Sequence, residues 1–326
     1  MRKFFAYFFG QGETAEFKYF SLAHILPILI LGGVIALIIV YRAKIRKLKH
    51  EEKLRITMAF ICIITEMSYF WRMCGVEALT PTPVDHLPIT VCGWGIIFCT
   101  FLCLTKNQTL FDIAYFWVLT GSIFGIATPT VIEFCGPTRF RFYQFWLEHT
   151  MGFVVLFYMM FVHKMRPNVK SIFKSYGMLL ILGVIAIIAN NIIPGANYLF
   201  MAKPEDTPSI LDILPKNYAV RIIIMASVMA LLFFIAYLPW LIKDIRVKKK
   251  VHILATSKSR TTTEFSYLDS EMEESNIEQQ KISNDIPTQK ESIQKKTTTK
   301  KKTSHTSPKS TKTATAKKKN TSNSSK

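Results

Sequence analysis

Long apolar stretches alternate with short polar segments over the first 242 residues, and the remaining residues are mostly polar. An α-helix rises about 1.5 Å per residue, so about 20 apolar residues cross the hydrocarbon core of a bilayer. The pattern therefore predicts an all-α, polytopic membrane protein with seven transmembrane helices. The first stretch is too long for a cleaved signal peptide, and its basic cluster follows it. The predicted spans are residues 20–41, 56–74, 87–104, 110–130, 142–162, 172–193 and 219–242.

Positive charges lie on alternate sides of the predicted spans. Seven Lys and Arg residues follow the first span within residues 42–55, and four follow the fifth within residues 164–174. The second connection contains neither Lys nor Arg. Cytoplasmic loops carry the excess of these residues. We therefore expect the N-terminus outside, the C-terminus in the cytoplasm and a multi-pass location in the cell membrane.

The charge composition divides the chain into two regions. Half of the 326 residues are hydrophobic, 19% are charged, and the net charge is +19. From residue 243 onward, 20 Lys and Arg stand against 9 Asp and Glu among many Ser and Thr. Such a segment cannot bury enough apolar area to fold. We expect a transmembrane domain over residues 1–242 and a mostly disordered cytoplasmic tail over residues 243–326.

The basic tail suggests an anionic partner. Lysines near a membrane are attracted to anionic headgroups, so we expect the tail to lie against the membrane surface. Nucleic-acid binding is not favoured, because no aromatic residues alternate with the lysines to stack on bases.

Polar side chains inside the predicted spans need an explanation, because each is costly in hydrocarbon. By helical rise, His24, Glu66, Cys92, His149 and Asn191 all fall in the outer half of the bilayer. Each has a structural explanation when taken alone, since a polar side chain can bond a neighbouring helix and a lone Cys is usually a core residue. Together they contain the parts of one site. Other polar candidates in the spans are Arg72, Asp112, Glu148 and Asn190.

The types of these side chains predict a nucleophilic site. Cys92 would be the nucleophile, and His149 would be the base that makes its thiolate. Glu66 would orient the imidazole. Glu148, which precedes His149 in the sequence, is the less favoured alternative for this role. His24 or Asn191 would donate to the oxyanion of the transition state.

No metal or cofactor is predicted. The chain has six cysteines but no CxxC pair. Cys92, Cys99 and Cys103 share one stripe of a predicted helix, but three ligands on one straight helix cannot surround an ion. We therefore expect a site that works without a metal or a cofactor.

The connection before the last predicted span is long and mixes apolar with polar residues. Asn197, Lys203, Ser209 and Asp212 could cover the outer mouth of the site and bind the headgroup of a lipid. Lys203 would be the contact to phosphate. The alternative is an ordered interfacial loop without any chemistry.

Several segments resemble a family that joins bacterial YwaF-like integral membrane proteins with the eukaryotic transmembrane protein 164. The resemblance extends from about residue 20 to residue 242 and leaves out the basic tail. The matching segments are residues 20–24 (FSLAH), 87–92 (LPITVC), 105–107 (TKN), 110–117 (LFDIAYFW), 140–149 (FRFYQFWLEH), 166–167 (RP), 197–204 (NYLFMAKP) and 209–214 (SILDIL).

This resemblance implies a fold similar to the androgen-induced integral membrane hydrolases, which use Thr and His. It also implies acyl transfer on lysophospholipids, including ether lipids. The cysteine nucleophile of the family falls on Cys92 and its histidine on His149. The family often has Leu-Gly-Pro-Trp-Pro after the sixth span, where this chain has LPKNY at residues 214–218. We therefore expect a different specificity for the headgroup.

The leading hypothesis is a lipid acyltransferase or hydrolase that acts on phospholipids or lysophospholipids through a Cys–His acyl-enzyme at the outer leaflet. Two alternatives remain: a transporter or substrate-binding membrane subunit with the same pocket, and a non-catalytic scaffold whose tail binds partners. A transporter needs access from both faces. The inner half of the predicted spans is almost entirely apolar apart from Asp112, which favours a site open to one side.

Overall fold

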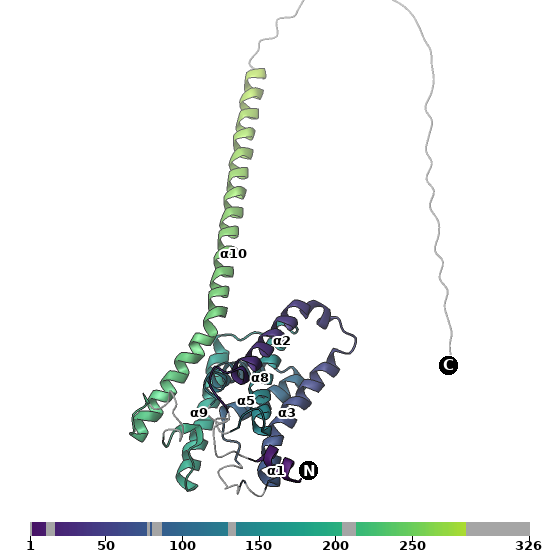
Figure 1. The fold of residues 1–326 in the computed structure, drawn as a ribbon. Coiled ribbons are helices and arrows are strands. Elements are labelled where there is room, and N and C mark those ends of the chain that lie inside the picture. Colours follow the sequence, from purple (N-terminus) through teal and green to yellow (C-terminus); the bar gives the residue numbers. More distant parts are fainter. Residues whose placement is uncertain are drawn as a thin grey trace, which may run out of the picture. The chain divides into compact units, whose positions relative to one another are not determined.

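All regular elements in the described residues are helices. The computed structural model describes residues 2–10, 17–76, 79, 87–129, 135–203 and 213–284. The all-α prediction is confirmed for this part of the chain, in which η2 is a π-helix and η4 a 3₁₀-helix. The elements in Figure 1 are α1 (Arg2–Phe9), α2 (Leu22–Arg46), α3 (Glu51–Gly75), α5 (Val91–Thr105), α6 (Gln108–Trp117), η2 (Val118–Ser122), α7 (Ile123–Ala127), α8 (Phe140–Phe161), α9 (Val169–Ile192), η4 (Tyr198–Phe200) and α10 (Tyr218–Asn284).

Each predicted span falls largely on a helix or on a continuous run of helices. In the described residues, five stretches are long and apolar enough to cross a bilayer: α2, α3, the run from α6 to α7, α9 and α10. The chain is therefore a polytopic membrane protein by length and composition. The helix α5 is shorter, with 15 residues. The helix α8 has 22 residues but is not one of the five.

The helix α8 has a central place in the bundle. It contacts α2, α3, α5, α6 and η2, and 12 of its 22 residues are buried. A helix shielded by its neighbours can carry polar side chains without exposing them to hydrocarbon. For this reason α8 can support a buried polar site.

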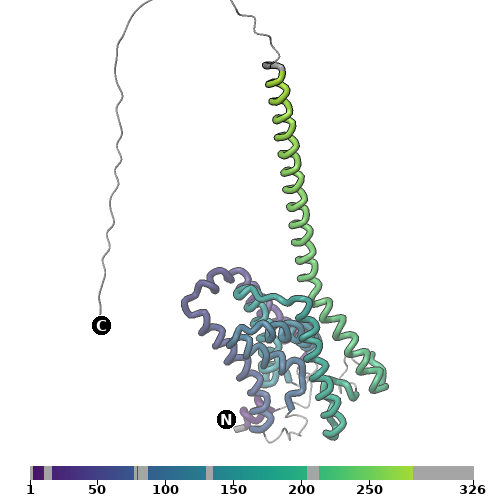
Figure 2. The backbone as a smooth tube through the Cα atoms, turned by 180° about the vertical axis from the view of Figure 1, so that it is seen from behind, coloured from purple at the N-terminus to yellow at the C-terminus, as the bar shows by residue number. Residues whose placement is uncertain are grey.

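The helices α9 and α10 contact each other over only part of their length. The Tyr176 hydroxyl donates to the carbonyl oxygen of Ala226 at 3.0 Å, and the rings of Phe116 and Phe233 stack between α6 and α10. Towards the end of α9 and the start of α10, the two helices diverge in both views (Figures 1 and 2). Residues from both helices line a cavity there.

Two acidic residues outside this cavity, one fully buried and one partly exposed, are held by ion pairs. Asp112 is fully buried, and its carboxylate accepts from Gln108 Nε2 at 2.7 Å and from Lys174 Nζ at 2.8 Å. Glu51 forms an ion pair with Arg55 at 3.1 Å. Breaking such a pair leaves an uncompensated buried charge, so these residues have a structural role.

The chain divides into two compact units, residues 1–254 and 255–326. The transmembrane helix was expected to end at residue 242 and to be followed by disorder, whereas α10 extends to Asn284. Every side chain described from Ile245 to Lys281 is exposed. This part of the helix therefore depends on local backbone hydrogen bonds and not on a core. The hydroxyls of three threonines in this part donate to carbonyl oxygens four residues earlier, so they need no partner outside the helix.

Candidate functional site

A cavity of about 980 Å³ lies among the helices of the first unit. This volume is at the upper end of the ~300–1,000 Å³ typical of small-molecule sites. Residues of α3, α5, η2, α7, α8, α9, η4 and α10 line it.

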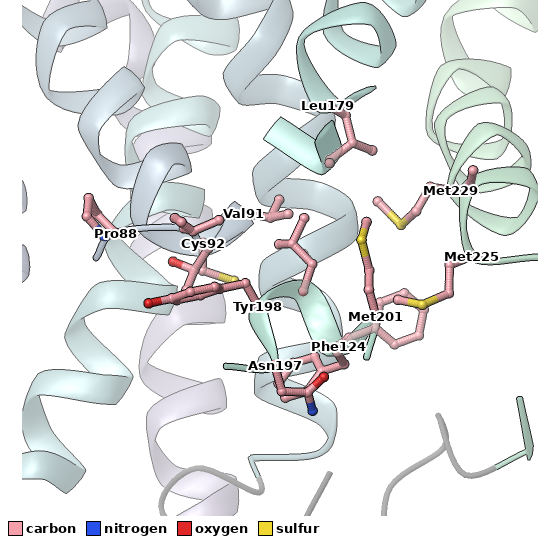
Figure 3. A pocket seen from close by; sticks show the side chains of 18 of the residues that line it. Pro88, Val91, Cys92, Phe124, Leu179, Asn197, Tyr198, Met201, Met225 and Met229 are labelled. Carbon is pink, nitrogen blue, oxygen red and sulfur yellow. The ribbon is translucent and has the colours of Figure 1, made fainter. Parts of the chain in front are cut away.

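Most of the lining is apolar. Figure 3 shows Leu179 from α9, Met225 and Met229 from α10, Phe124 from α7 and Met201 directly after η4 around the cavity. Methionine side chains are flexible and polarisable, so they adapt to the shape of an apolar ligand. This wall suits a hydrocarbon chain.

A smaller part of the lining is polar. It contains Glu66 from α3, Cys92 from α5, and Arg141, Glu148 and His149 from α8. Three of these residues, Glu66, Cys92 and His149, are among those expected from the sequence to share one site. They line the same cavity, so the cavity combines an apolar wall with nucleophilic and charged groups.

Cys92 lies in the first turn of α5. The Thr90 side chain caps this helix by accepting from the N–H of Gly93 at 3.1 Å. The thiol lies against the backbone of η2, where a Cβ added at Gly121 would be 3.5 Å from Cys92 Sγ, and the Ser122 side chain lies beside it. Single turns of π-helix occur frequently at functional sites. Here the π-turn brings a residue without a side chain to the thiol.

His149 is held by its own helix. Its Nδ1 lies 2.9 Å from the carbonyl oxygen of Phe145. A carbonyl only accepts, so Nδ1 carries the proton and Nε2 of the neutral ring is an acceptor. The Nε2 side faces α7, because a Cβ added at Gly125 would lie 2.6 Å from it. The carbonyl of Phe145, and not Glu66, therefore orients the imidazole.

A hydrogen-bonded row of side chains runs along α8 beside the cavity. Arg141 Nη1 donates to Gln144 Oε1, and Gln144 Nε2 donates to Glu148 Oε2 at 2.9 Å and to the carbonyl oxygen of Thr65 at 3.3 Å. Arg141 also lies 3.8 Å from Glu148 and 4.9 Å from the centroid of the Tyr69 ring. The row fixes the charged groups of α8 against α3.

Glu66 completes the polar part from α3. Its side chain is buried, and a Cβ added at Gly93 would lie 2.8 Å from Glu66 Oε1. The carboxyl group thus lies against the first turn of α5. Glu66 therefore supports the helix turn that carries Cys92.

A family model described as the TMEM164 family matches residues 19–237. The chain belongs to this family. The match includes every residue that lines the cavity, and it confirms the resemblance noted in the sequence. No curated protein and no solved structure matches the chain.

In this TMEM164-family chain, two predicted supporting residues lie away from the cavity. His24 Nδ1 accepts from the N–H of Phe20 at 3.1 Å, and its Nε2 donates to the carbonyl oxygen of Ile126 at 2.9 Å. Asn191 is exposed and donates to the carbonyl oxygen of Ile187 at 2.7 Å. Neither lines the cavity. We therefore assign neither of them to the oxyanion, and His24 has a structural role.

The described residues that were predicted to bind a lipid headgroup also have positions that differ from those expected. Asn197 lines the cavity, but its side chain closes the turn after η4: Oδ1 accepts from the N–H of Ala202 and of Lys203, at 3.0 and 3.1 Å. Lys203 does not line the cavity. Ser209 and Asp212 lie outside the described residues.

Sequence reasoning missed several residues of the TMEM164-family site, although patterns for them are present. Arg141 and Gln144 were missed, although they lie seven and four residues before Glu148, a candidate from the sequence, and so share one helix face with it. Gly121 and Gly125 form a pair of small residues four apart, a pattern that lets another helix approach closely. Both patterns predict that these helix faces make contacts, but neither identifies the helix that packs against them.

Proposed function

We propose that this protein is a lipid acyltransferase or hydrolase with a Cys–His acyl-enzyme. The observation that carries the proposal is the placement of Cys92 and His149 in one amphipathic cavity. Their side chains meet two glycines one turn apart on the same segment, Gly121 and Gly125. The hydrogen bond of His149 to Phe145 leaves Nε2 as the acceptor, which is the state a general base needs.

The proposed reaction has two steps. The Cys92 thiol gives its proton to His149 Nε2, and the thiolate attacks the acyl carbonyl of a phospholipid. The ester C–O bond breaks, His149 protonates the departing oxygen, and a thioester remains on Cys92. In the second step, a lysophospholipid hydroxyl or water gives its proton to His149 and attacks the thioester. The C–S bond breaks, and the thiolate regains a proton from His149.

The start of α5 is suited to stabilise the oxyanion. The first N–H groups of an α-helix have no partner within the helix, and Cys92 lies in this turn. Backbone donors at a helix N-terminus stabilise developing negative charge. This role replaces the one expected for His24 and Asn191.

The lining of the cavity favours a lipid as the substrate. Its apolar wall from α9 and α10 fits an acyl chain, and its polar part from α3, α5 and α8 fits an ester and a polar headgroup. Phospholipids and lysophospholipids have this combination of groups.

The proposal includes seven spans, with the N-terminus outside and the tail in the cytoplasm, in a cell membrane. In a cysteine-free background, Asp85→Cys should react with an impermeant maleimide in intact cells. Lys250→Cys should react only after permeabilisation. Reaction of both from the same side contradicts this topology.

The function is tested by trapping the thioester. The full chain is incubated with a phospholipid that carries an alkyne in its acyl chain, and labelled peptides are identified by mass spectrometry. We expect a hydroxylamine-sensitive acyl group on Cys92. Cys99→Ala is the matched control, because Cys99 is buried on the same helix and does not line the cavity. Binding of the lipid without any acyl group on Cys92 would favour the binding-pocket alternative.

A further inference from the structure

Three buried polar atoms at the start of α10 have no partner in the part of the chain that the structure describes. They are Nη1 and Nη2 of Arg221 and the hydroxyl oxygen of Tyr218. The Arg221 side chain is almost completely buried, with 1% of the residue exposed. A buried charged group without a counter-charge is costly, so these atoms are suited to bind an anion.

Arg221 and Tyr218 are three residues apart and therefore lie on the same side of the helix. The guanidinium offers two free NH₂ groups as a fork, and the phenol offers one O–H. Tetrahedral oxyanions such as phosphate accept this geometry, because a fork of two N–H donors binds two oxygens at once. The first turn of α10 adds the positive end of a helix dipole.

The pair adjoins the cavity through η4. Arg221 Nε donates to the carbonyl oxygen of Phe200 at 2.9 Å, and Phe200 itself lines the cavity together with Ile222, the next residue of α10. Leu199 and Phe200 have φ values of 56° and 55°. Two successive non-glycine residues in the left-handed region are strained. Arg221 thus holds a strained turn at the edge of the cavity while its two NH₂ groups remain available.

We propose that Arg221 and Tyr218 bind the phosphate of a phospholipid whose hydrocarbon chains occupy the cavity. The inference rests on the proposed lipid substrate but not on the acyl-transfer step. It replaces Lys203 as the expected contact to phosphate. A phosphate bound here holds the headgroup at the start of α10, while the chains lie along Met225 and Met229.

Binding is measured in the full chain carrying Cys92→Ala, so that no turnover occurs. Thermal-shift titrations in detergent use dioctanoylphosphatidylethanolamine, dioctanoylglycerol with the same chains but no phosphate, and sodium phosphate. We expect the phospholipid to bind about 10- to 100-fold more tightly than the diacylglycerol, the range for hydrogen bonds to a charged group. Arg221→Gln should remove this preference. Arg246→Gln, an exposed arginine on the same helix, is the control and should keep it.

Tyr218→Phe keeps the test decisive if Arg221→Gln fails to fold. The hydroxyl has no partner among the residues that the structure describes, so its removal should not affect folding. It should nevertheless weaken the phospholipid preference about tenfold, as expected for one hydrogen bond to a charged group. An unchanged preference in Tyr218→Phe or in folded Arg221→Gln overturns the inference. Arg221-dependent binding of sodium phosphate without any preference for the phospholipid overturns it in favour of a free-phosphate site.

This experiment separates the inference from the proposed function. If Cys92 forms no thioester but the Arg221-dependent preference is observed, the acyl-enzyme fails and the phosphate site stands. If the thioester forms and no preference is observed, the reverse holds.

Discussion

Replacing Cys92 or His149 with alanine is expected to abolish acyl transfer, with a loss of at least about 10³-fold in kcat/KM. Cys92→Ala removes the atom that forms the thioester. Among the described residues that line the cavity, His149 has the one imidazole, and a positioned general base contributes about 10²–10⁴-fold. The measurement is initial-rate transfer of a labelled acyl chain in reconstituted vesicles, with folding followed by thermal unfolding.

The double variant should be no slower than either single variant, because nucleophile and base act as one unit. Cys99→Ala is the matched control and should retain full activity, since Cys99 Sγ faces the carbonyl oxygen of Gly152 in the core. Multiplicative losses in the double variant, or full activity in Cys92→Ala, would contradict the acyl-enzyme.

Gly125→Ala is expected to give the second-largest effect, a loss of about 10²-fold in kcat with little loss of binding. The added Cβ would lie 2.6 Å from both Nε2 and Cδ2 of His149, a distance that real Cβ atoms do not tolerate. The ring must rotate or shift, and a displacement of about 1 Å at a catalytic group can cost about 10²-fold. The ester substrate should still bind, because the apolar wall does not change.

A glycine series gives the controls for this prediction. At Gly121 the added Cβ would lie 3.2 Å from Val91 and 3.5 Å from Cys92 Sγ, so Gly121→Ala should lower kcat less than Gly125→Ala. At Gly177, inside α9, an added Cβ has no neighbour within 4 Å. Gly177→Ala should leave activity unchanged and raise helix stability slightly. Equal activity of all three variants would show that the position of His149 does not limit the reaction.

The predicted helices were confirmed where the bilayer restricts both the side chains and the backbone of a segment. Hydrocarbon requires apolar side chains and satisfied backbone groups, so the seven stretches in the sequence predicted helices that the structure contains. The span predicted at residues 142–162 falls on α8, but the sequence did not show that neighbouring helices shield the polar residues of this helix. The length of α10 beyond residue 242 was also missed, since an exposed helix leaves no apolar pattern.

Counting residues along the predicted spans addresses the depth of a side chain but not its direction. Counting residues from the ends of the spans placed Cys92, Glu66 and His149 at one level, and all three line one cavity. The same count included His24 and Asn191, which face the backbone of α7 and of α9 instead. Helical rise gives the height of a side chain, but the rotation of a helix about its axis depends on what packs against it.

The sequence by itself therefore determined an all-helical membrane protein of the TMEM164 family, and it predicted a thiol, an imidazole and a carboxyl group at one depth. Only the tertiary structure decided which of these groups share a cavity and which nitrogen of His149 is an acceptor. It also showed that Arg221 is buried without a counter-charge among the described residues. The physical reason is that the free energy of placing a side chain in hydrocarbon depends mainly on the type of that residue, and the sequence alone gives the type. Contacts between helix faces and the partners of buried charges arise only when distant segments pack together.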